Sequence, residues 1–138
     1  IVDLHGKRAE EAGISLQFDL KDAHQLKTDH LRLKIILNNL YSNSLRFRNP
    51  KGDPPFIKLT VKQKKDKSIL TLEDNGIGIR SSHLDKIFEM FYRATDRTSG
   101  SGLGLYITKQ TVEALNGTIS VASKYGQGTT FTIALPAS

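Results

Sequence analysis

The stretch Leu70-Thr71-Leu72-Glu73-Asp74-Asn75-Gly76-Ile77-Gly78-Ile79 (residues 70–79) joins an alternating apolar strand to a glycine-containing turn. Because side chains repeat every second residue along a strand, Asp74 shares the face of Leu70 and Leu72. That face is expected to pack against helices, so the carboxylate of Asp74 should be buried. A buried carboxylate is costly unless hydrogen-bond donors satisfy it. The strand therefore ends in a candidate functional residue.

Two interpretations of the turn after Asp74 are open. An amine on a ligand, such as the exocyclic amine of adenine, would be a suitable donor for the carboxylate. Gly76 and Gly78 would then let the backbone turn tightly and approach that ligand. Alternatively, the Asp-Asn-Gly sequence is ordinary turn chemistry and carries no function.

Upstream, apolar spacing predicts a helix that begins after Asp29, which can cap it, and ends near Phe47. Asn39, Asn43 and Arg46 are four and three residues apart, so they form one stripe at the edge of the core. An amide oxygen is a hard, neutral ligand that suits Mg²⁺, and an arginine can hold phosphate oxygens. Taken alone, this stripe is better explained as a polar helix flank.

A third candidate site opens the last predicted helix, at residues 103–115. It consists of Gly100, Ser101, Gly102, Leu103, Gly104 and Leu105. Backbone amides at a helix start attract phosphate. No strand precedes this stretch, which argues against the dinucleotide-binding fingerprint. A glycine cluster is a weak signal by itself.

The remaining elements complete a fold of the α+β class. Ser82 with Asp85 resembles a capping pair for a short helix that reaches about Met90. The order of elements predicts a two-layer α/β sandwich, in which a mixed, mostly antiparallel sheet carries helices on one face. Alternation predicts strands at 14–20, 57–62, 69–73, 119–121 and 131–135, hairpin turns at 63–67 and 125–128, and a mobile loop at 92–102.

Composition limits the class of protein. The chain has 138 residues, no cysteine and a formal net charge of +6, so disulfides and thiolate metal sites are excluded. No apolar run is long enough to span a membrane. Lys62, Lys64, Lys65 and Lys67 fall at a predicted hairpin turn, where a solvated surface is the simpler interpretation. The charge permits nucleic-acid binding, but no interleaved aromatic and basic stripe supports it.

Together and in this order, the candidate sites resemble the sequence boxes of the ATP-binding catalytic domains of sensor histidine kinases. The resemblance runs from about Ile14 to Pro136. It includes an asparagine box (39–44), an Asp-Gly box (74–78), a phenylalanine box (87–93), a glycine box (102–105) and a closing glycine-threonine hairpin (126–131). It implies the nucleotide-binding fold shared with gyrase, heat-shock chaperone and mismatch-repair ATPases.

The resemblance implies a role for each matching residue. Asp74 would bind the adenine amine, with help from Thr129 through a water. Asn43 would ligate Mg²⁺, and Asn39 would lie near the phosphates. Further residues would contact ATP or anchor the lid over it. They are Gly76, Gly78, Phe88, Phe91, Gly100, Ser101, Gly102, Leu103, Gly104 and Leu105.

Some positions depart from the family's pattern. Arg46 stands where a phosphate-contacting lysine is frequent, and Phe47 after it would stack near the base. Met90 replaces a frequent arginine, so a contact with the γ-phosphate would fall to Arg93. Ser44 replaces the usual alanine, a small change that we expect to be neutral.

Asn39 separates two activities of this fold. In the hydrolysing relatives, a glutamate that activates water occupies this position, one helical turn before the magnesium asparagine. An amide cannot act as a general base near neutral pH, so ATP would be held for transfer to a histidine. The resemblance thus implies a protein histidine kinase. An ATP-hydrolysing machine and a binding module without nucleotide are the alternatives.

The resemblance also implies partners. The chain begins without methionine, and its histidines, at positions 5, 24, 30 and 83, are interpreted as surface or local structural residues. We therefore expect residues 1–12 to end a linker from a missing dimerisation and phosphoacceptor domain, and residues 13–138 to form the ATP-binding domain. This piece should lie in the cytoplasm and bind Mg-ATP without autophosphorylating. Its parent would be a homodimer that acts on a response regulator, and a membrane anchor in that parent is left open.

Overall fold

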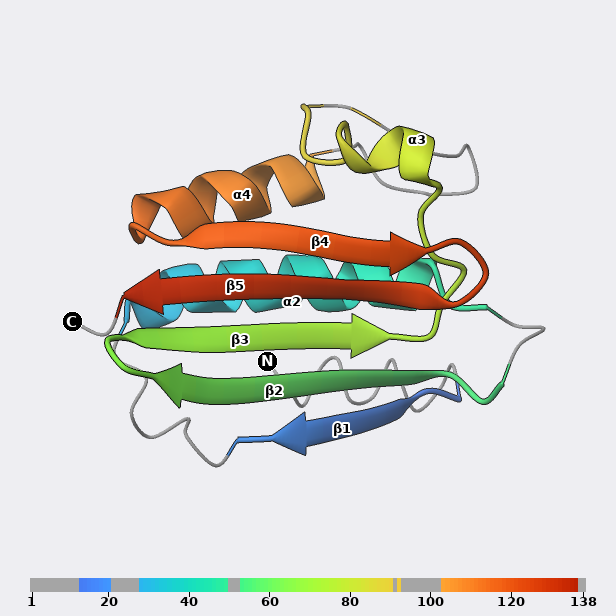
Figure 1. Ribbon diagram of the computed structural model, residues 1–138, viewed down its shortest axis with the longest axis horizontal. Helices are drawn as coiled ribbons and strands as arrows, with labels where there is room; N and C mark the ends of the chain where they lie inside the picture. The colour runs from blue at the N-terminus through green and yellow to red at the C-terminus, as the bar shows by residue number, and fades with distance from the viewer. Residues whose placement is uncertain (1–12, 21–27, 50–52, 91, 93–102, 137–138) are drawn as a thin grey trace.

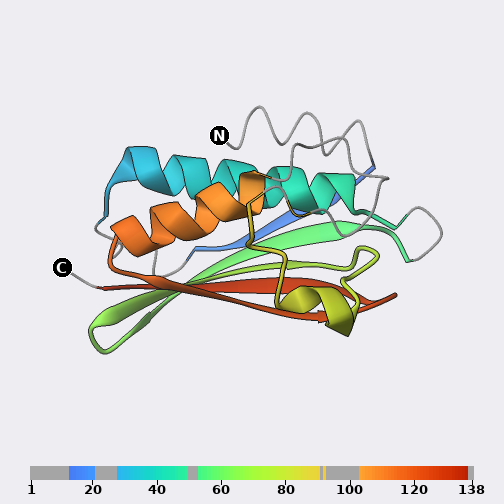
Figure 2. The ribbon, with the colours of Figure 1, turned by 90° about the horizontal axis from the view of Figure 1, so that it is seen from above.

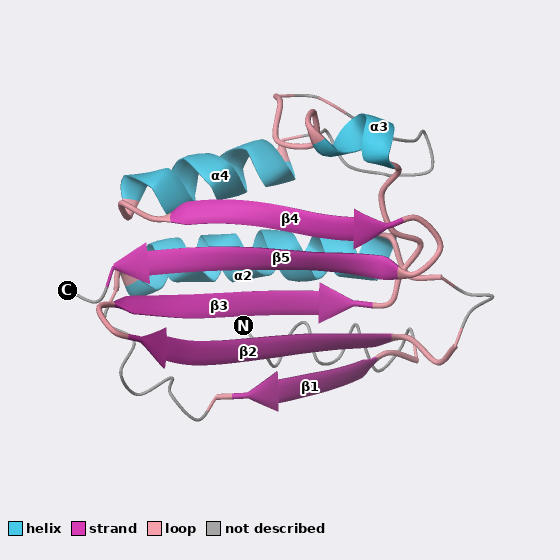
Figure 3. Ribbon diagram, viewed as in Figure 1, coloured by secondary structure: helices cyan, strands magenta, loops and turns pink. Residues whose placement is uncertain are grey.

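In the part of the chain that the computed structural model describes, five strands form one sheet and two long helices cover one of its faces (Figure 1). The structure describes residues 13–20, 28–49, 53–90, 92 and 103–136, so the predicted linker end at 1–12 lies outside it. Seen from above, α2 (His30–Arg46) and α4 (Gly104–Ala114) pack side by side over the strands (Figure 2). Colouring by secondary structure separates the two layers (Figure 3). The predicted two-layer α+β fold is confirmed.

The strand order is β1-β2-β3-β5-β4. The strands are β1 (Ser15–Asp19), β2 (Phe56–Lys64), β3 (Lys67–Asp74), β4 (Thr118–Lys124) and β5 (Gly128–Pro136). β1 runs parallel to β2, whereas β2–β3, β3–β5 and β5–β4 are antiparallel, which confirms the predicted mixed sheet. The central strand β3 ends at Asp74, which lies opposite Ile57 on one side and Thr129 on the other.

The β2–β3 hairpin turns at Lys65 and Asp66, a tighter turn than the predicted residues 63–67. Lys65 takes a left-handed φ of 49°. The four lysines of the run are all exposed. These lysines therefore lie on a solvated hairpin, as the simpler interpretation predicted.

α2 begins where predicted because Asp29 caps it. The Asp29 carboxylate accepts the N–H groups of Leu31 and Arg32 at 3.0 and 3.2 Å, which satisfies donors that a helix start leaves without partners. Ile36 and Leu40 then face the sheet and are at most 1 % exposed. The apolar periodicity thus fixes which side of α2 is buried.

α4 also follows its prediction. It ends at Ala114, and beyond it the left-handed φ of Asn116, 61°, lets the Gly117 N–H bond to the Val112 carbonyl at 3.0 Å. Thr108 and Val112 are fully buried. Within the described ranges, no helix combines the length and the apolar character needed to cross a membrane.

The core lies between the sheet and these helices. Alternate residues of β2, β3 and β5 face it, and burying a side chain of this kind stabilises the fold by about 1.5–3 kcal/mol. They are Ile57, Leu59, Val61, Leu70, Leu72, Phe131, Ile133 and Leu135. The same alternation carries Asp74 and Thr129 onto the inner face at the end of the sheet.

The helix predicted from Ser82 to about Met90 is wrong in its extent. α3 covers only Ser81–Leu84, beside the β4 edge of the sheet (Figure 1). Its N-cap is Arg80, and no side chain caps it, so the expected pair of Ser82 with Asp85 does not form a capping box.

Beyond α3 the chain continues in single turns. Backbone hydrogen bonds that each span three residues link Lys86 to His83, Glu89 to Lys86, and Tyr92 to Glu89. This spacing is tighter than that of an α-helix, and it accompanies burial of Ile87, which is 6 % exposed. His83 also hydrogen-bonds to the Tyr92 hydroxyl, as a local structural residue would.

Gly78 lies where the chain after β3 crosses the end of the β4–β5 hairpin. Its φ is 75°, and a Cβ at this position would lie 2.3 Å from the carbonyl oxygen of Lys124. One residue earlier, the Ile77 carbonyl accepts the Gly126 N–H at 2.6 Å. Both the backbone conformation and the close approach therefore require glycine.

Replacing Gly78 with alanine is expected to lower the free energy of unfolding by about 2–5 kcal/mol, since the left-handed conformation and the overpacked contact both add cost. Urea denaturation measures this loss. Gly13→Ala is the matched control, because its φ is 73° and an added Cβ meets nothing within 4 Å. Equal losses in the two variants would show that the contact with Lys124 is unimportant.

Candidate functional site

Asp74 turns its carboxylate from the end of β3 toward the helical layer and is 8 % exposed. Its Oδ1 accepts the Gly76 N–H at 2.9 Å, and its Oδ2 accepts the Ser44 hydroxyl at 2.8 Å. The backbone N–H of Thr129 is a third donor. The predicted burial of this carboxylate is therefore confirmed, with donors from α2, from the following turn and from β5.

Burial raises the pKa of the Asp74 carboxyl above its usual value. The hydrogen bonds from Gly76, Ser44 and Thr129 act in the opposite direction, and the neighbouring charge of Glu73 adds to the rise. A carboxylate offers about four lone-pair sites. With three protein donors in place, the ionised group has room for one more donor, which a ligand amine could supply.

The C-terminal half of α2 lies beside this carboxylate. Asn43 is 8 % exposed, Asn39 is half-buried and Arg46 is exposed, so the predicted stripe runs from the core edge to the surface. The Phe47 carbonyl accepts the Ile77 N–H at 2.9 Å. This bond joins the end of α2 to the turn that follows Asp74.

Arg46 reaches toward the start of α4. A Cβ placed on Gly104 would lie 4.0 Å from a guanidinium nitrogen of Arg46. Free backbone N–H groups and the helix dipole make a helix start attractive to anions, and a guanidinium is a strong donor to phosphate. Leu103 occupies the N-cap position of this helix without a side-chain capping bond, and Leu105 packs against the core. The arrangement therefore suits a phosphate group between α2 and α4.

Gly76 and Gly78 approach the protein's own backbone closely. A Cβ on Gly76 would lie 2.4 Å from the Phe47 carbonyl oxygen. Directly before Gly76, the Asn75 side chain accepts the Phe56 N–H and donates to the Pro54 carbonyl. These residues shape the turn after β3, and the ligand contacts predicted for the two glycines remain predictions.

Thr129 is 7 % exposed and lies opposite Asp74 in the sheet. Its hydroxyl is 2.9 Å from Ser123 Oγ, which also accepts the Ile79 N–H at 2.8 Å and donates to the Gly128 carbonyl at 2.8 Å. Because Ser123 has one hydroxyl hydrogen, Thr129 is the donor in their contact. Ser123 thus orients Thr129, a role that sequence reasoning missed because it depends on the pairing of β4 with β5.

Ser44 makes a contact that the sequence did not predict. The sequence predicts a neutral replacement for alanine, yet the side chain is 2 % exposed and donates to Asp74. Alanine has no group that could make this bond. Ser44 is therefore part of the site's hydrogen bonding.

Phe88 packs against the core. Its ring meets Phe131 edge-on, with centroids 6.3 Å apart and planes at 73°, and the ammonium of Lys109 lies 5.7 Å from its centroid. The other residues predicted for the lid lie outside the described residues, and their roles remain predictions. They are Phe91, Arg93, Gly100, Ser101 and Gly102.

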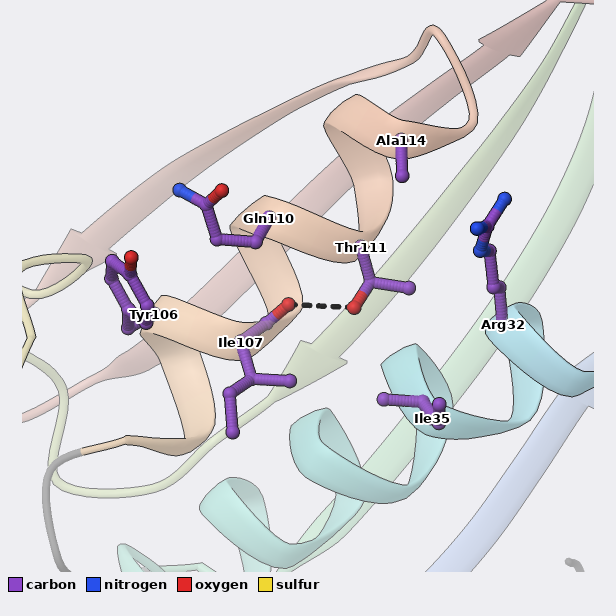
Figure 4. Close-up of a pocket in the computed structure, with 7 residues that line it drawn as sticks. All are labelled: Arg32, Ile35, Tyr106, Ile107, Gln110, Thr111 and Ala114. Atoms are coloured by element: carbon purple, nitrogen blue, oxygen red, sulfur yellow. Dashed lines mark hydrogen bonds between the residues drawn. The ribbon is translucent and has the colours of Figure 1, made fainter.

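A separate groove of about 240 Å³ runs between α2 and α4 (Figure 4). Its lining residues are Arg32, Ile35, Tyr106, Ile107, Gln110, Thr111 and Ala114. None of the predicted site residues lines it, and on α2 it involves the N-terminal half of the helix, whereas Asn43 and Ser44 lie in the C-terminal half. The groove is therefore distinct from the site around Asp74.

The side chains near Asp74 limit how a metal ion could be bound. Among the residues that the structure describes, no group of three or more His, Asp or Glu side chains could hold a metal ion. Asn43 offers one neutral amide oxygen. Mg²⁺ commonly keeps several waters and binds through few protein ligands together with substrate phosphates. The residues present therefore fit an ion that is shared with a bound phosphate chain.

Known proteins resemble this chain along nearly its whole length. Residues 28–138 match the family described as histidine kinase-, DNA gyrase B-, and HSP90-like ATPase. Sensor protein SrrB of Staphylococcus aureus (strain NCTC 8325 / PS 47) is 35 % identical over 134 residues, which cover 94 % of this chain. The match spans only 22 % of the length of that relative.

Solved structures share the fold. The nucleotide-free catalytic domain of histidine kinase ThkA has a TM-score of 0.83 and 25 % identity, covering 99 % of this chain and 87 % of that one. Full-length ShkA, solved in complex with AMPPNP, has a TM-score of 0.80 and 28 % identity, covering 98 % of this chain and 28 % of ShkA. The similarity in sequence and the similarity in fold therefore extend over the same residues.

Asp74→Asn is expected to raise the free energy of unfolding of the nucleotide-free protein at neutral pH, because burial disfavours the charged carboxylate. The folded-state pKa of Asp74 is raised above the usual 3.8. As the pH rises from the usual pKa toward the raised folded-state pKa, the unfolded chain releases a proton that the folded chain retains. The wild type therefore loses stability relative to the variant. Urea denaturation at several pH values should show the difference growing from acidic to neutral pH.

The exposed neighbour Glu73 supplies the control for this measurement, because it points to the opposite face of β3. For Glu73→Gln, the stability difference from the wild type should show no comparable increase between acidic and neutral pH. A stability difference between Asp74→Asn and the wild type that is independent of pH would contradict the raised pKa.

Proposed function

Because this chain belongs to the histidine kinase-, DNA gyrase B-, and HSP90-like ATPase family, as a catalytic domain of the sensor histidine kinase type, we propose that it binds Mg-ATP for phosphoryl transfer. Family membership confirms the resemblance found in the sequence motifs. The proposed acceptor of the γ-phosphoryl group is a histidine on a separate domain.

The buried carboxylate of Asp74 is the observation that carries this proposal. It is desolvated at the edge of the core, and it has acceptor capacity beyond its protein donors. The exocyclic amine of adenine would supply the additional donor. Thr129 would assist, since its hydroxyl donates to Ser123 and its oxygen is left to accept a hydrogen from a water or from the base.

The phosphates would lie between Arg46 and the start of α4. The guanidinium lies 4.0 Å from the position of a Cβ on Gly104, the first residue of α4. The guanidinium and the start of α4 both attract negative charge, and they come from different elements, so together they would orient the triphosphate. The similar protein ShkA was solved in complex with AMPPNP, which supports the proposal that this chain binds a nucleotide.

Asn43 would hold Mg²⁺ through its amide oxygen, with the rest of the coordination supplied by phosphates and water. When bound, the ion would offset charge on the transferring phosphoryl group. Asn43 is 8 % exposed, so its position is fixed by packing on α2. A neutral ligand at this point would bind the ion without repelling the phosphates.

Asn39 supports transfer of the phosphoryl group over hydrolysis. It lies one helical turn before Asn43, and its amide cannot deprotonate a water near neutral pH. The chain would therefore hold ATP intact and rely on positioning for transfer. The proposed partners are the phosphoacceptor histidine domain of the same protein, which would be a homodimer, and a response regulator in the cytoplasm.

Calorimetric titration tests base recognition directly. The wild type should bind ATP more tightly than ITP, which lacks the exocyclic amine. Asp74→Asn should weaken ATP binding about 10- to 100-fold, because a hydrogen bond to a charged group contributes about 1.5–3 kcal/mol. Glu73→Gln, the neighbouring exposed carboxylate, should leave ATP affinity unchanged.

Two outcomes of this titration would count against the proposal. If Asp74→Asn bound ATP as well as the wild type, the base-recognition role of Asp74 would be wrong. If the wild type hydrolysed bound ATP steadily, the ATP-hydrolysing alternative would replace phosphoryl transfer.

The magnesium role is tested by replacing Asn43 with alanine. The ratio of ATP affinities with and without Mg²⁺ should fall by about tenfold, as for other changes around metal ligands. Asn38→Ala, on the same helix, is the control and should keep the wild-type ratio. An unchanged ratio in Asn43→Ala would remove Asn43 from the magnesium site.

A further inference from the structure

Ser44 and Asp74 are 30 residues apart in sequence, and their side chains meet in the core edge between α2 and β3. The hydroxyl of Ser44 donates to Asp74 Oδ2 at 2.8 Å, and Ser44 is 2 % exposed. The bond is therefore shielded from water, which makes it stronger than a similar bond on the surface.

The carboxylate plane of Asp74 is held by donors on both of its oxygens. Gly76 N–H fixes Oδ1, and Ser44 fixes Oδ2. Rotation of the carboxylate would break both bonds. Without Ser44, the backbone donors of Gly76 and Thr129 remain, but Oδ2 loses its side-chain donor and the orientation of the carboxylate is less well defined.

We propose that Ser44 is a positioning residue for nucleobase recognition, whose hydroxyl orients the Asp74 carboxylate toward the exocyclic amine of the base. This inference rests on the proposed function, because it assigns Ser44 to the base-recognition step. Ser44 does not contact the nucleotide in this proposal. It acts through Asp74 and so contributes to the choice between adenine and bases without an amine.

The chemistry of a serine suits this task. A hydroxyl can donate to Oδ2 while its own oxygen remains an acceptor. A donor also offsets part of the cost of burying the charged carboxylate, since a buried acceptor left without its partner is costly. Alanine at this position would remove the donor and leave Oδ2 to find another.

A purely structural role for Ser44 makes a different prediction. If the bond merely tied α2 to the sheet, its loss would weaken the binding of every nucleotide alike. If the bond orients Asp74, its loss would weaken ATP binding selectively. ITP presents a carbonyl oxygen in place of the amine, so its affinity depends little on the orientation of this acceptor.

The experiment compares the dissociation constants of ATP and ITP by calorimetry for the wild type, Ser44→Ala and Ser44→Thr. Ser44→Ala should weaken ATP binding about tenfold and ITP binding less than about twofold, in line with the loss of a hydrogen bond to a charged group. Ser44→Thr keeps the hydroxyl and should retain a wild-type preference for ATP. Thermal denaturation identifies the variants that fold. For each of these, the ratio of the affinity for ATP to the affinity for ITP (the ATP-to-ITP ratio) tests the proposal.

Ser68→Ala is the matched control. Ser68 is 1 % exposed, and its hydroxyl donates to the side-chain oxygen of Gln63 at 2.8 Å. It lies at the opposite end of β3 from Asp74. Loss of this buried serine should leave the ATP-to-ITP ratio unchanged.

The possible failures are distinguishable. If Asp74→Asn lowers the ATP-to-ITP ratio while Ser44→Ala leaves it unchanged, the positioning role is wrong and the proposed function stands. Equal losses for ATP and ITP in Ser44→Ala would also overturn it. If Asp74→Asn leaves ATP binding unchanged, base recognition by Asp74 and the role of Ser44 are both wrong.

Discussion

The hydrogen bonds to the buried carboxylate of Asp74 connect the sheet, the end of α2 and the turn after β3. Moving a carboxylate out of water is costly, so the fold must supply donors to it. They come from Ser44, Gly76 and Thr129, which lie on three different segments. Each donor must therefore be placed by packing, and the rest of the site follows from that placement.

Fixing the end of α2 against Asp74 also positions the residues that the proposed function needs. Asn43 precedes Ser44, and Arg46 follows one half-turn later toward the start of α4. The Phe47 carbonyl packs so closely against Gly76 that no side chain fits there. The turn after β3 and the last turn of α2 are thus a single packed unit, and a shift of either element would move the carboxylate, the amide and the guanidinium together.

The fold by itself does not select an activity, because kinases and ATP-hydrolysing enzymes share it. The chemistry depends on individual side chains, and we propose that the amide of Asn39, in place of a base, disfavours hydrolysis. The charged carboxylate that we propose for base recognition is also unfavourable for folding, since burial raises its pKa. Sites of this kind exchange some stability for a group that a ligand can satisfy.

Sequence patterns were sufficient to predict the strands, the two long helices and the inward face of Asp74, because strand alternation, helix periodicity and the Asp29 cap are properties of neighbouring residues. They also identified the family through ordered motifs. The length predicted for α3 was too great, because the chain after Leu84 forms tight turns that bury Ile87 and the expected capping pair does not form. Only the tertiary structure revealed the contacts of Ser44 and Ser123, which join residues 30 and 44 positions apart. No local pattern encodes such contacts, because they exist only once helix and strands have packed.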